Sequence, residues 1–329
     1  MKYWLMPHIQ LVPLDDSLIF YRKNKKSFKL KVQGIKIGSM LVKGFCVEDL
    51  SVILNLTKEQ AQNLILMLLG EELICKKYEA EPRFNRLVSY LDSFENGFLK
   101  LQKSRLLLLG VGGLGSHIFQ HLCANGINTT ILDHDLVSES NLSRQTLYGQ
   151  KDVGQKKVRV CQDHARRLNT KINVIEKKIG SVDDLSSILE KNYFDLIIST
   201  IDDPVWLATT FVVKAAKKYQ IPLLRANSRA IGPLFINGFA CPLCSSSKKS
   251  ENIDEASAII ERYQQGFLAR RPAAISYELA FVGLICVREA IHFLIGERPE
   301  SLGAELCWRK EDLSLKAIPV LNSGCAVCS

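Results

Sequence analysis

The stretch LLLLGVGGLG, residues 106–115, decides the fold of most of this chain. Its four consecutive leucines predict a buried strand, and the glycines that follow predict a tight turn into a helix from Leu114. A strand, a glycine turn and a helix in this order let backbone N–H groups approach a phosphate closely, at the positive end of the helix. We therefore expect a nucleotide to bind at four glycines: Gly110, Gly112, Gly113 and Gly115.

Strands and helices alternate on the carboxyl side of this turn. Apolar runs predict strands at 105–109, 129–132, 174–176 and 196–199, with helices from 114 and near 156–168. Strands that are apolar throughout, with helices between them, are typical of a parallel sheet covered on both faces. The sequence thus predicts an α/β fold with a doubly wound, Rossmann-like, mostly parallel sheet.

Asp133 ends the second of these strands. A carboxylate at that place can accept hydrogen bonds from the ribose hydroxyls of a bound nucleotide. Taken alone, the glycine turn and this acid fit an NAD-dependent dehydrogenase or a nucleotide-binding module without catalysis.

Two short segments after the second strand carry more positive charge than the diphosphate of a bound dinucleotide requires. They are NLSRQ at 141–145 and GQKK at 154–157. Arg144 can grip phosphate oxygens with its planar fork, and Lys157 supplies a point charge that can stabilise departing pyrophosphate. Asn141 and Gln145 complete the expected nucleotide site. Arg144 could instead pair with Asp135, and Lys157 could lie on a solvated helix, but together they indicate ATP.

The fourth strand ends in STIDD, residues 199–203. Ligands of open α/β sheets bind at the carboxyl ends of the strands, and Mg²⁺ on ATP prefers one or two carboxylates. We assign this role to Asp202. Either Asp202 or Asp203 could instead cap the helix that follows.

The order of these motifs resembles the ubiquitin-activating superfamily, which includes the ThiF/MoeB-like enzymes that adenylate sulfur-carrier proteins. The resemblance runs from about Pro82 to the C-terminus and implies that ATP activates a carboxylate as an acyl-adenylate. The stretch RFNR at 83–86 resembles the family's Arg-Tyr-x-Arg opening. That resemblance implies that Arg86 reaches the ATP site of a partner subunit in a homodimer.

Two CxxC pairs stand 80 residues apart: Cys241 with Cys244, and Cys325 with Cys328. Four thiolates make a closed tetrahedral site suited to structural Zn²⁺, whereas a redox dithiol usually needs one pair. Similar enzymes place the same two pairs in this way. The six isolated cysteines are expected to be buried packing residues: Cys46, Cys75, Cys123, Cys161, Cys286 and Cys307.

Residues 1–80 predict a separate winged-helix-like α+β domain, and residues 81–329 the adenylation domain. Short strands are expected at 18–22 and 28–32, a capped helix from Thr57, and a last strand at 73–75. Glu79-Ala80-Glu81-Pro82 marks the boundary, because proline disfavours helix in the residue before it. The domain could be a stabilising appendage alone.

Because of this domain, the chain resembles one branch of the superfamily in particular. Enzymes of that branch, such as the microcin C and pantocin A enzymes, modify ribosomally made antibiotic peptides. Short stretches at 232–235 and 271–273 resemble that branch. This resemblance implies that the substrate is a precursor peptide and that the N-terminal domain binds its leader. The leader would add as an extra strand beside the strand near 28–32. The adenylated carboxylate would then be attacked within the peptide. The alternative substrate is the C-terminal glycine of a ubiquitin-like sulfur carrier.

Composition limits the other classes of function. The net charge of +9 is scattered along the 329 residues, so we expect no nucleic acid partner. No uninterrupted run of eighteen apolar residues and no export signal occur, which predicts a cytoplasmic protein with no membrane partner.

Overall fold

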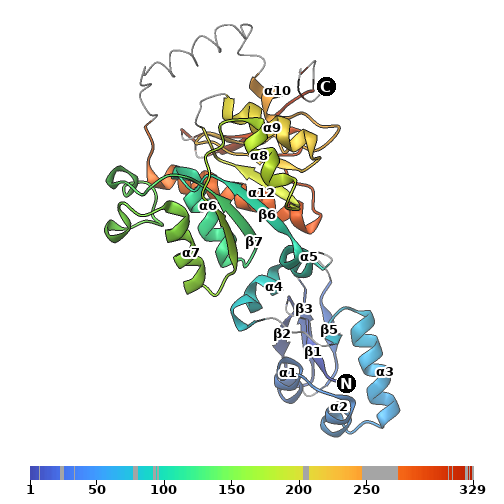
Figure 1. The fold of residues 1–329 in the computed structure, drawn as a ribbon. Helices are drawn as coiled ribbons and strands as arrows, with labels where there is room; N and C mark the ends of the chain where they lie inside the picture. Colours follow the sequence, from blue (N-terminus) through green and yellow to red (C-terminus); the bar gives the residue numbers. More distant parts are fainter. Residues whose placement is uncertain are drawn as a thin grey trace, which may run out of the picture. The chain divides into compact units, whose positions relative to one another are not determined.

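The computed structural model describes two compact units, Met1–Leu99 and Lys100–Ser329 (Figure 1). The described residues are 1–6, 8–22, 26–32, 34–76, 81–91, 94, 96–202, 207–246, 273–309, 311–312, 314–322, 325 and 327. Within these residues no helix is long and apolar enough to cross a membrane.

A five-stranded parallel sheet forms the centre of the larger unit, as the sequence predicted. Its order is β10 (Leu223–Arg225), β9 (Leu196–Ser199), β6 (Arg105–Leu109), β7 (Asn128–Leu132) and β8 (Ile172–Ile175). The glycine-turn strand β6 lies in the middle. Its four leucines are fully buried, because helices cover both faces of the sheet.

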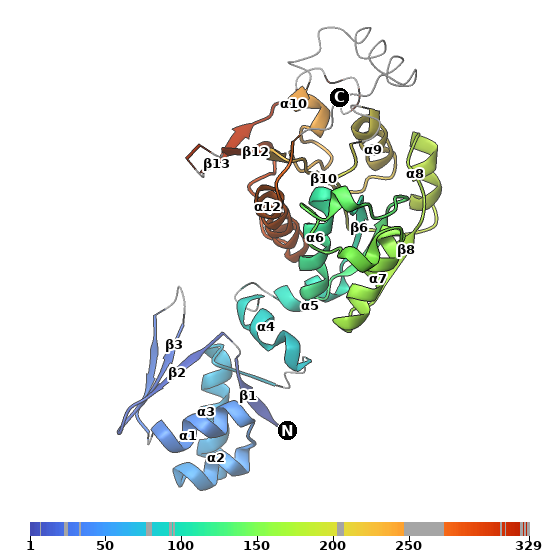
Figure 2. The same cartoon turned by 90° about the vertical axis from the view of Figure 1, so that its left-hand side faces the viewer.

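The helices of this unit fall into two layers (Figure 2). On one face α8 (Val182–Leu189) packs against α9 (Leu207–Lys218), and their apolar residues share a core with Leu107 and Leu109 of the sheet. On the other face α6 (Gly113–Ala124) packs along the twenty-residue α12 (Ser276–Ile295). Helix α7 (Lys157–Arg167) contacts the edge strand β8.

An antiparallel sheet follows in the same unit. Its strands are β11 (Ala230–Ile231), β12 (Ala304–Arg309) and β13 (Ser314–Pro319), with β12 in the centre. Three shorter helices complete the described elements of this region: η2 (Glu139–Asn141), η3 (Gln150–Asp152) and α10 (Pro242–Ser246). Helix α5 (Gly97–Lys103) contains the point at which the chain divides into its two units.

The smaller unit joins a three-stranded antiparallel sheet to three helices. The sheet is β2 (Gln10–Pro13), β3 (Leu18–Tyr21) and β4 (Phe28–Leu30), in that order. The helices are α1 (Gly34–Lys43), α2 (Val47–Leu54) and α3 (Lys58–Gly70). Strands β1 (Tyr3–Leu5) and β5 (Ile74–Lys76) pair separately, and η1 (Pro82–Phe84) and α4 (Asn85–Leu91) follow.

This unit has its own hydrophobic core. Leu18 and Phe20 of β3 and Phe45 are fully buried in it. The predicted cap of α3 is confirmed, because the Gln60 N–H donates to Thr57 Oγ1 at 3.2 Å and the Thr57 N–H donates to Gln60 Oε1 at 2.9 Å. Sheet and helices therefore fold together as an α+β module.

Candidate active site

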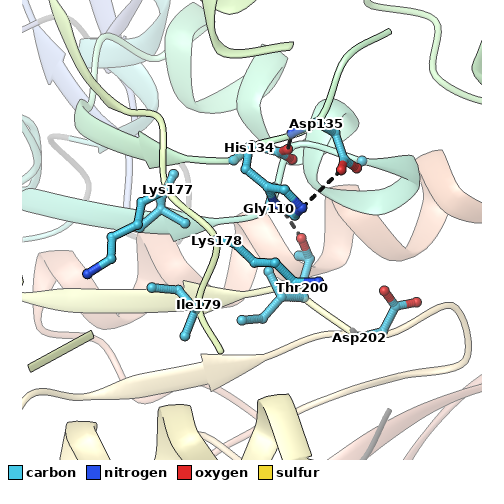
Figure 3. Close-up of a pocket in the computed structure, with 12 residues that line it drawn as sticks. Gly110, His134, Asp135, Lys177, Lys178, Ile179, Thr200 and Asp202 are labelled. Atoms are coloured by element: carbon cyan, nitrogen blue, oxygen red, sulfur yellow. Dashed lines mark hydrogen bonds and ion pairs between the residues drawn. The ribbon is translucent and has the colours of Figure 1, made fainter. Parts of the chain in front are cut away.

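An open pocket lies at the carboxyl end of the parallel sheet, where β6, β7, β8 and β9 all end (Figure 3). It holds about 540 Å³ of empty space. Its lining comes from four segments of chain: Gly110 and Gly112, Leu132 to Asp135, Lys177 to Ile179, and Thr200 to Asp202. The structure thus brings the glycine turn, Asp133 and Asp202 to one place, as the motif order predicted.

The glycines of the turn are required for different reasons. Gly110 has a φ of +87°, and a Cβ there would lie 2.9 Å from Thr200 Oγ1. A Cβ on Gly115 would lie 2.0 Å from the Gly110 carbonyl oxygen, and one on Gly113 would lie 3.1 Å from Leu279 Cδ1. A Cβ on Gly112 would meet nothing within 4 Å. Gly112 therefore leaves open space at the start of α6, where a phosphate can approach the backbone.

Asp133 holds the turn in place. The backbone N–H of Val111 donates to Asp133 Oδ2, and that of Asp135 donates to Asp133 Oδ1, both at 2.8 Å. The Tyr148 hydroxyl, which sequence reasoning missed, donates to the Val111 carbonyl oxygen at 2.7 Å. Each carboxylate oxygen of Asp133 keeps a second lone pair that can accept a hydrogen bond from a ligand hydroxyl.

Lys157 is a buried cation. Its side chain is 6% exposed, and Nζ lies 2.8 Å from Asp135 Oδ2 at the pocket wall. The interpretation of Lys157 as a solvated lysine is therefore wrong. The expected alternative for Arg144, a pair with Asp135, is also not what the structure shows, because Arg144 Nη1 donates to the Ser140 carbonyl oxygen instead.

The segment that carries Arg144 is folded around Asn141. The Asn141 carbonyl oxygen accepts hydrogen bonds from the N–H groups of Arg144 and Gln145 at 3.0 and 2.9 Å, and its Oδ1 accepts one from the Ser138 N–H at 3.2 Å. Gln145 is 3% exposed, and its Oε1 has no hydrogen-bond partner within the described residues. A buried acceptor without a partner is costly, and a ligand hydroxyl or bound water would satisfy it.

Thr200 and Asp202 follow β9. Thr200 Oγ1 lies 3.0 and 3.1 Å from the carbonyl oxygens of Leu109 and Gly110, so the end of β9 is tied to the glycine turn. Asp202 lines the pocket beyond it (Figure 3). Asp203, the alternative helix cap, lies outside the described residues.

Three cations near this edge were missed by the sequence analysis. Lys177 and Lys178 line the pocket directly after β8, and Lys177 Nζ lies 3.0 Å from Asp184 Oδ1. Their position after a predicted strand could have revealed them. Arg225 ends β10, and its Nε donates to Thr209 Oγ1 at 2.9 Å. Burial lowers the pKa of Arg225, while Glu305 and Asp202 raise it.

Three of the four paired cysteines lie together. The Sγ atom of Cys241 is 3.8 Å from those of both Cys244 and Cys325, and all three thiols are buried. Four sulfurs placed about 2.3 Å from one Zn²⁺ ion in a tetrahedron are separated by about 3.8 Å, so these thiols fit the metal. Cys328, the fourth predicted ligand, lies outside the described residues.

The isolated cysteines divide into two groups. Cys123, Cys161 and Cys286 are fully buried, as predicted, and burial raises the pKa of Cys123 to about 12. The prediction is wrong for Cys46, Cys75 and Cys307, which are only partly buried. Cys46 is the N-cap of α2, and the other two lie on the less buried faces of β5 and β12. Arg86 lies on α4 in the smaller unit, so its expected role across a dimer stays a prediction.

A model of the ThiF family matches residues 84–317, and this range contains every element of the pocket. The chain belongs to the ThiF family. Molybdopterin-synthase adenylyltransferase of Escherichia coli K12 is 29% identical over 255 residues, which cover 75% of this chain and 95% of that protein. The probable adenylyltransferase/sulfurtransferase MoeZ of Mycobacterium tuberculosis is 34% identical over 139 residues, which cover 42% of this chain and 34% of MoeZ.

Several solved structures share the fold of this chain over nearly its whole length. Escherichia coli MccB with ATP has a TM-score of 0.68 at 20% identity, and the match covers 100% of both chains. PaaA has a TM-score of 0.68 at 17% identity, covering 96% of this chain and 99% of that one. The doubly wound fold and the resemblance to the ThiF/MoeB-like enzymes are confirmed. The named relatives are adenylyltransferases, which favours adenylation over the dehydrogenase alternative.

The glycines provide a matched pair of substitutions. We expect Gly112→Ala to weaken ATP binding at least tenfold with little change in melting temperature, because its methyl group would fill only the ligand's space. Gly115→Ala should lower the melting temperature, because its methyl group would collide with the Gly110 carbonyl. Calorimetric titration with ATP and thermal denaturation measure the two effects. Unchanged ATP affinity in Gly112→Ala would place the phosphates elsewhere.

Proposed function

We propose that this chain adenylates a carboxylate of a ribosomally synthesised precursor peptide in the biosynthesis of a peptide antibiotic. The observation that carries the proposal is the smaller unit. Residues 1–83 precede the ThiF match, yet they fold around their own core. Structures that match over the whole chain include the microcin C7 biosynthetic enzyme MccB in complex with N-formylated MccA. A peptide-binding domain explains this additional unit better than a stabilising appendage.

The residues that line the pocket, together with the segments at 141–145 and 154–157 that lie outside its lining, are assigned to ATP. Gly112 leaves room for phosphate at the positive end of α6, and Asp133 can accept the ribose hydroxyls. Arg144 and Lys157 are assigned to the phosphates, while Asn141 holds the segment that carries Arg144 and Gln145. Asp202 would hold Mg²⁺, which supplies charge neutralisation to the phosphate oxygens.

The reaction follows from these assignments. A carboxylate oxygen of the peptide attacks the α-phosphorus of ATP, and the bond to the bridging oxygen breaks, so that pyrophosphate leaves. Lys157 and Arg144 stabilise the negative charge that develops on the leaving group. An amide or amine nitrogen of the same peptide then attacks the acyl carbon, loses a proton and releases AMP. The product is a cyclised or similarly modified peptide.

ATP–pyrophosphate exchange tests this assignment. The peptide encoded by a short reading frame beside this gene should support exchange, and a ubiquitin-like carrier ending in Gly-Gly should not. We expect Asp202→Asn and Lys157→Met each to slow exchange roughly 100-fold or more, because each removes a preorganised charge. Asp183→Asn on α8, an exposed acid outside the pocket, is the matched control. Exchange with the carrier alone would establish the sulfur-carrier alternative, which the similarity to molybdopterin-synthase adenylyltransferase favours.

Strand β4 is the proposed docking edge for the leader. It is an end strand of its sheet, paired with β3 through Phe28, Lys29 and Leu30. Phe28 and Leu30 are half-buried against the core, while Lys29 is exposed on the opposite face. An extended leader that adds to β4 would gain main-chain hydrogen bonds, and its alternate side chains would cover Phe28 and Leu30.

Removing residues 1–80 tests the clamp. We expect the deletion to weaken binding of the full precursor by at least tenfold from a micromolar affinity, about −8 kcal/mol, while ATP still binds. Fluorescence anisotropy with labelled precursor measures the precursor affinity. Calorimetric titration with ATP shows whether the larger unit is still folded. Equal precursor affinity in the two proteins would exclude the clamp.

Zinc content tests the role of the cysteine cluster. We expect about one Zn²⁺ per chain, held by Cys241, Cys244, Cys325 and Cys328, because a closed thiolate site contributes folding energy. Cys241→Ser should lose the metal and lower the melting temperature, whereas the partly buried Cys46→Ser should keep both unchanged. Elemental analysis of purified protein decides the matter. A metal-free chain with an unchanged melting temperature would refute the assignment.

The active form is proposed to be a homodimer. In this arrangement Arg86 would reach the ATP site of a second copy, as the family's opening motif implies. The cytoplasmic location stays a prediction of the sequence.

A further inference from the structure

Helix α6 carries a buried histidine one turn beyond the glycine turn. The Nε2 atom of His117 lies 3.1 Å from the carbonyl oxygen of Arg144, and the residue is 5% exposed. Because a carbonyl oxygen only accepts, the facing nitrogen must carry the hydrogen and donate it. Burial lowers the pKa of His117, which favours a neutral ring that donates through Nε2.

This contact joins two segments that are far apart in sequence and that the proposed function assigns to ATP. His117 belongs to the helix that starts at the glycine turn, and Arg144 lies on the segment after η2. The Arg144 side chain can reach a phosphate only from the place at which its backbone is held. The hydrogen bond from His117 holds that backbone against α6.

Close packing at the base of the His117 side chain limits its movement. A Cβ on Gly283 of α12 would lie 3.2 Å from His117 Cβ, so the two helices approach closely at this residue. With α12 close to its Cβ and the Arg144 carbonyl oxygen at its Nε2, the His117 side chain is held at both ends.

We infer that His117 is a positioning residue that sets Arg144 against the glycine turn and so determines affinity for the triphosphate of ATP. The inference rests on the proposed function, because it assumes that Arg144 binds phosphate. It assigns no contact between His117 and the nucleotide. Replacing His117 should therefore weaken the binding of a nucleoside triphosphate more than the binding of a nucleoside monophosphate, which has fewer phosphates to contact Arg144.

The test compares affinities for AMPCPP, a non-hydrolysable ATP analogue, and for AMP by calorimetry. His117→Leu removes the donor, and we expect roughly three- to tenfold weaker binding of AMPCPP with AMP affinity nearly unchanged. His117→Gln, which keeps an N–H donor, should restore most of the difference. His121→Leu, the same substitution one turn further along α6, is the control. Hydrogen exchange should show faster amide exchange at 141–148 in His117→Leu alone.

The outcomes separate the two claims. Equal losses for AMPCPP and AMP, or unchanged exchange at 141–148, would make His117 a packing residue and overturn the inference while the proposed function stands. Unchanged AMPCPP affinity in His117→Leu would likewise overturn the inference and leave the proposed function standing. Failure of the wild-type chain to bind AMPCPP at all would overturn the proposed function and this inference together.

Discussion

The hydrogen bond from the Val111 N–H to Asp133 connects the ends of β6 and β7, two of the four strands that end at the pocket. Val111 lies in the turn after β6 and Asp133 directly follows β7, so the bond fixes the glycine turn against its neighbouring strand. Thr200 secures the other side of the turn from β9. The start of α6 is therefore aimed at the open space beside Gly112. A phosphate site needs this rigidity, because preorganised donors stabilise charge without rearrangement.

Three cations around this turn have acids near them, so their charge is compensated within the protein. Lys157 is buried against Asp135, and the charges of Glu305 and Asp202 act on Arg225 at the end of β10. Burying an ionised group is expensive unless it is paired, so each cation has an acid near it. Lys177 also has an acid partner, Asp184, on α8. A polyanionic nucleotide would enter between these pairs.

The sequence allowed the sheet and the glycine turn to be predicted because both follow from local patterns. Four leucines followed by glycines favour a buried strand and a tight turn over other structures. The strand predicted at 196–199 is likewise found at Leu196–Ser199. Tyr148, His117 and Arg225 could not be predicted as site residues. Each acts through a contact with a residue distant in sequence, and neither spacing nor residue type indicates that contact. The partial exposure of Cys46 likewise depends on tertiary packing.

The two units together define the chemistry that we propose, since the larger unit offers an adenylation site and the smaller one a sheet edge for a peptide. Transfer of ¹⁸O from substrate to AMP tests this claim most directly. A precursor peptide carrying ¹⁸O in its carboxylates is incubated with ATP and the enzyme, and the AMP is analysed by mass spectrometry. Attack of the carboxylate on the α-phosphorus predicts AMP that contains one ¹⁸O atom. Unlabelled AMP, or release of ADP and phosphate, would contradict it.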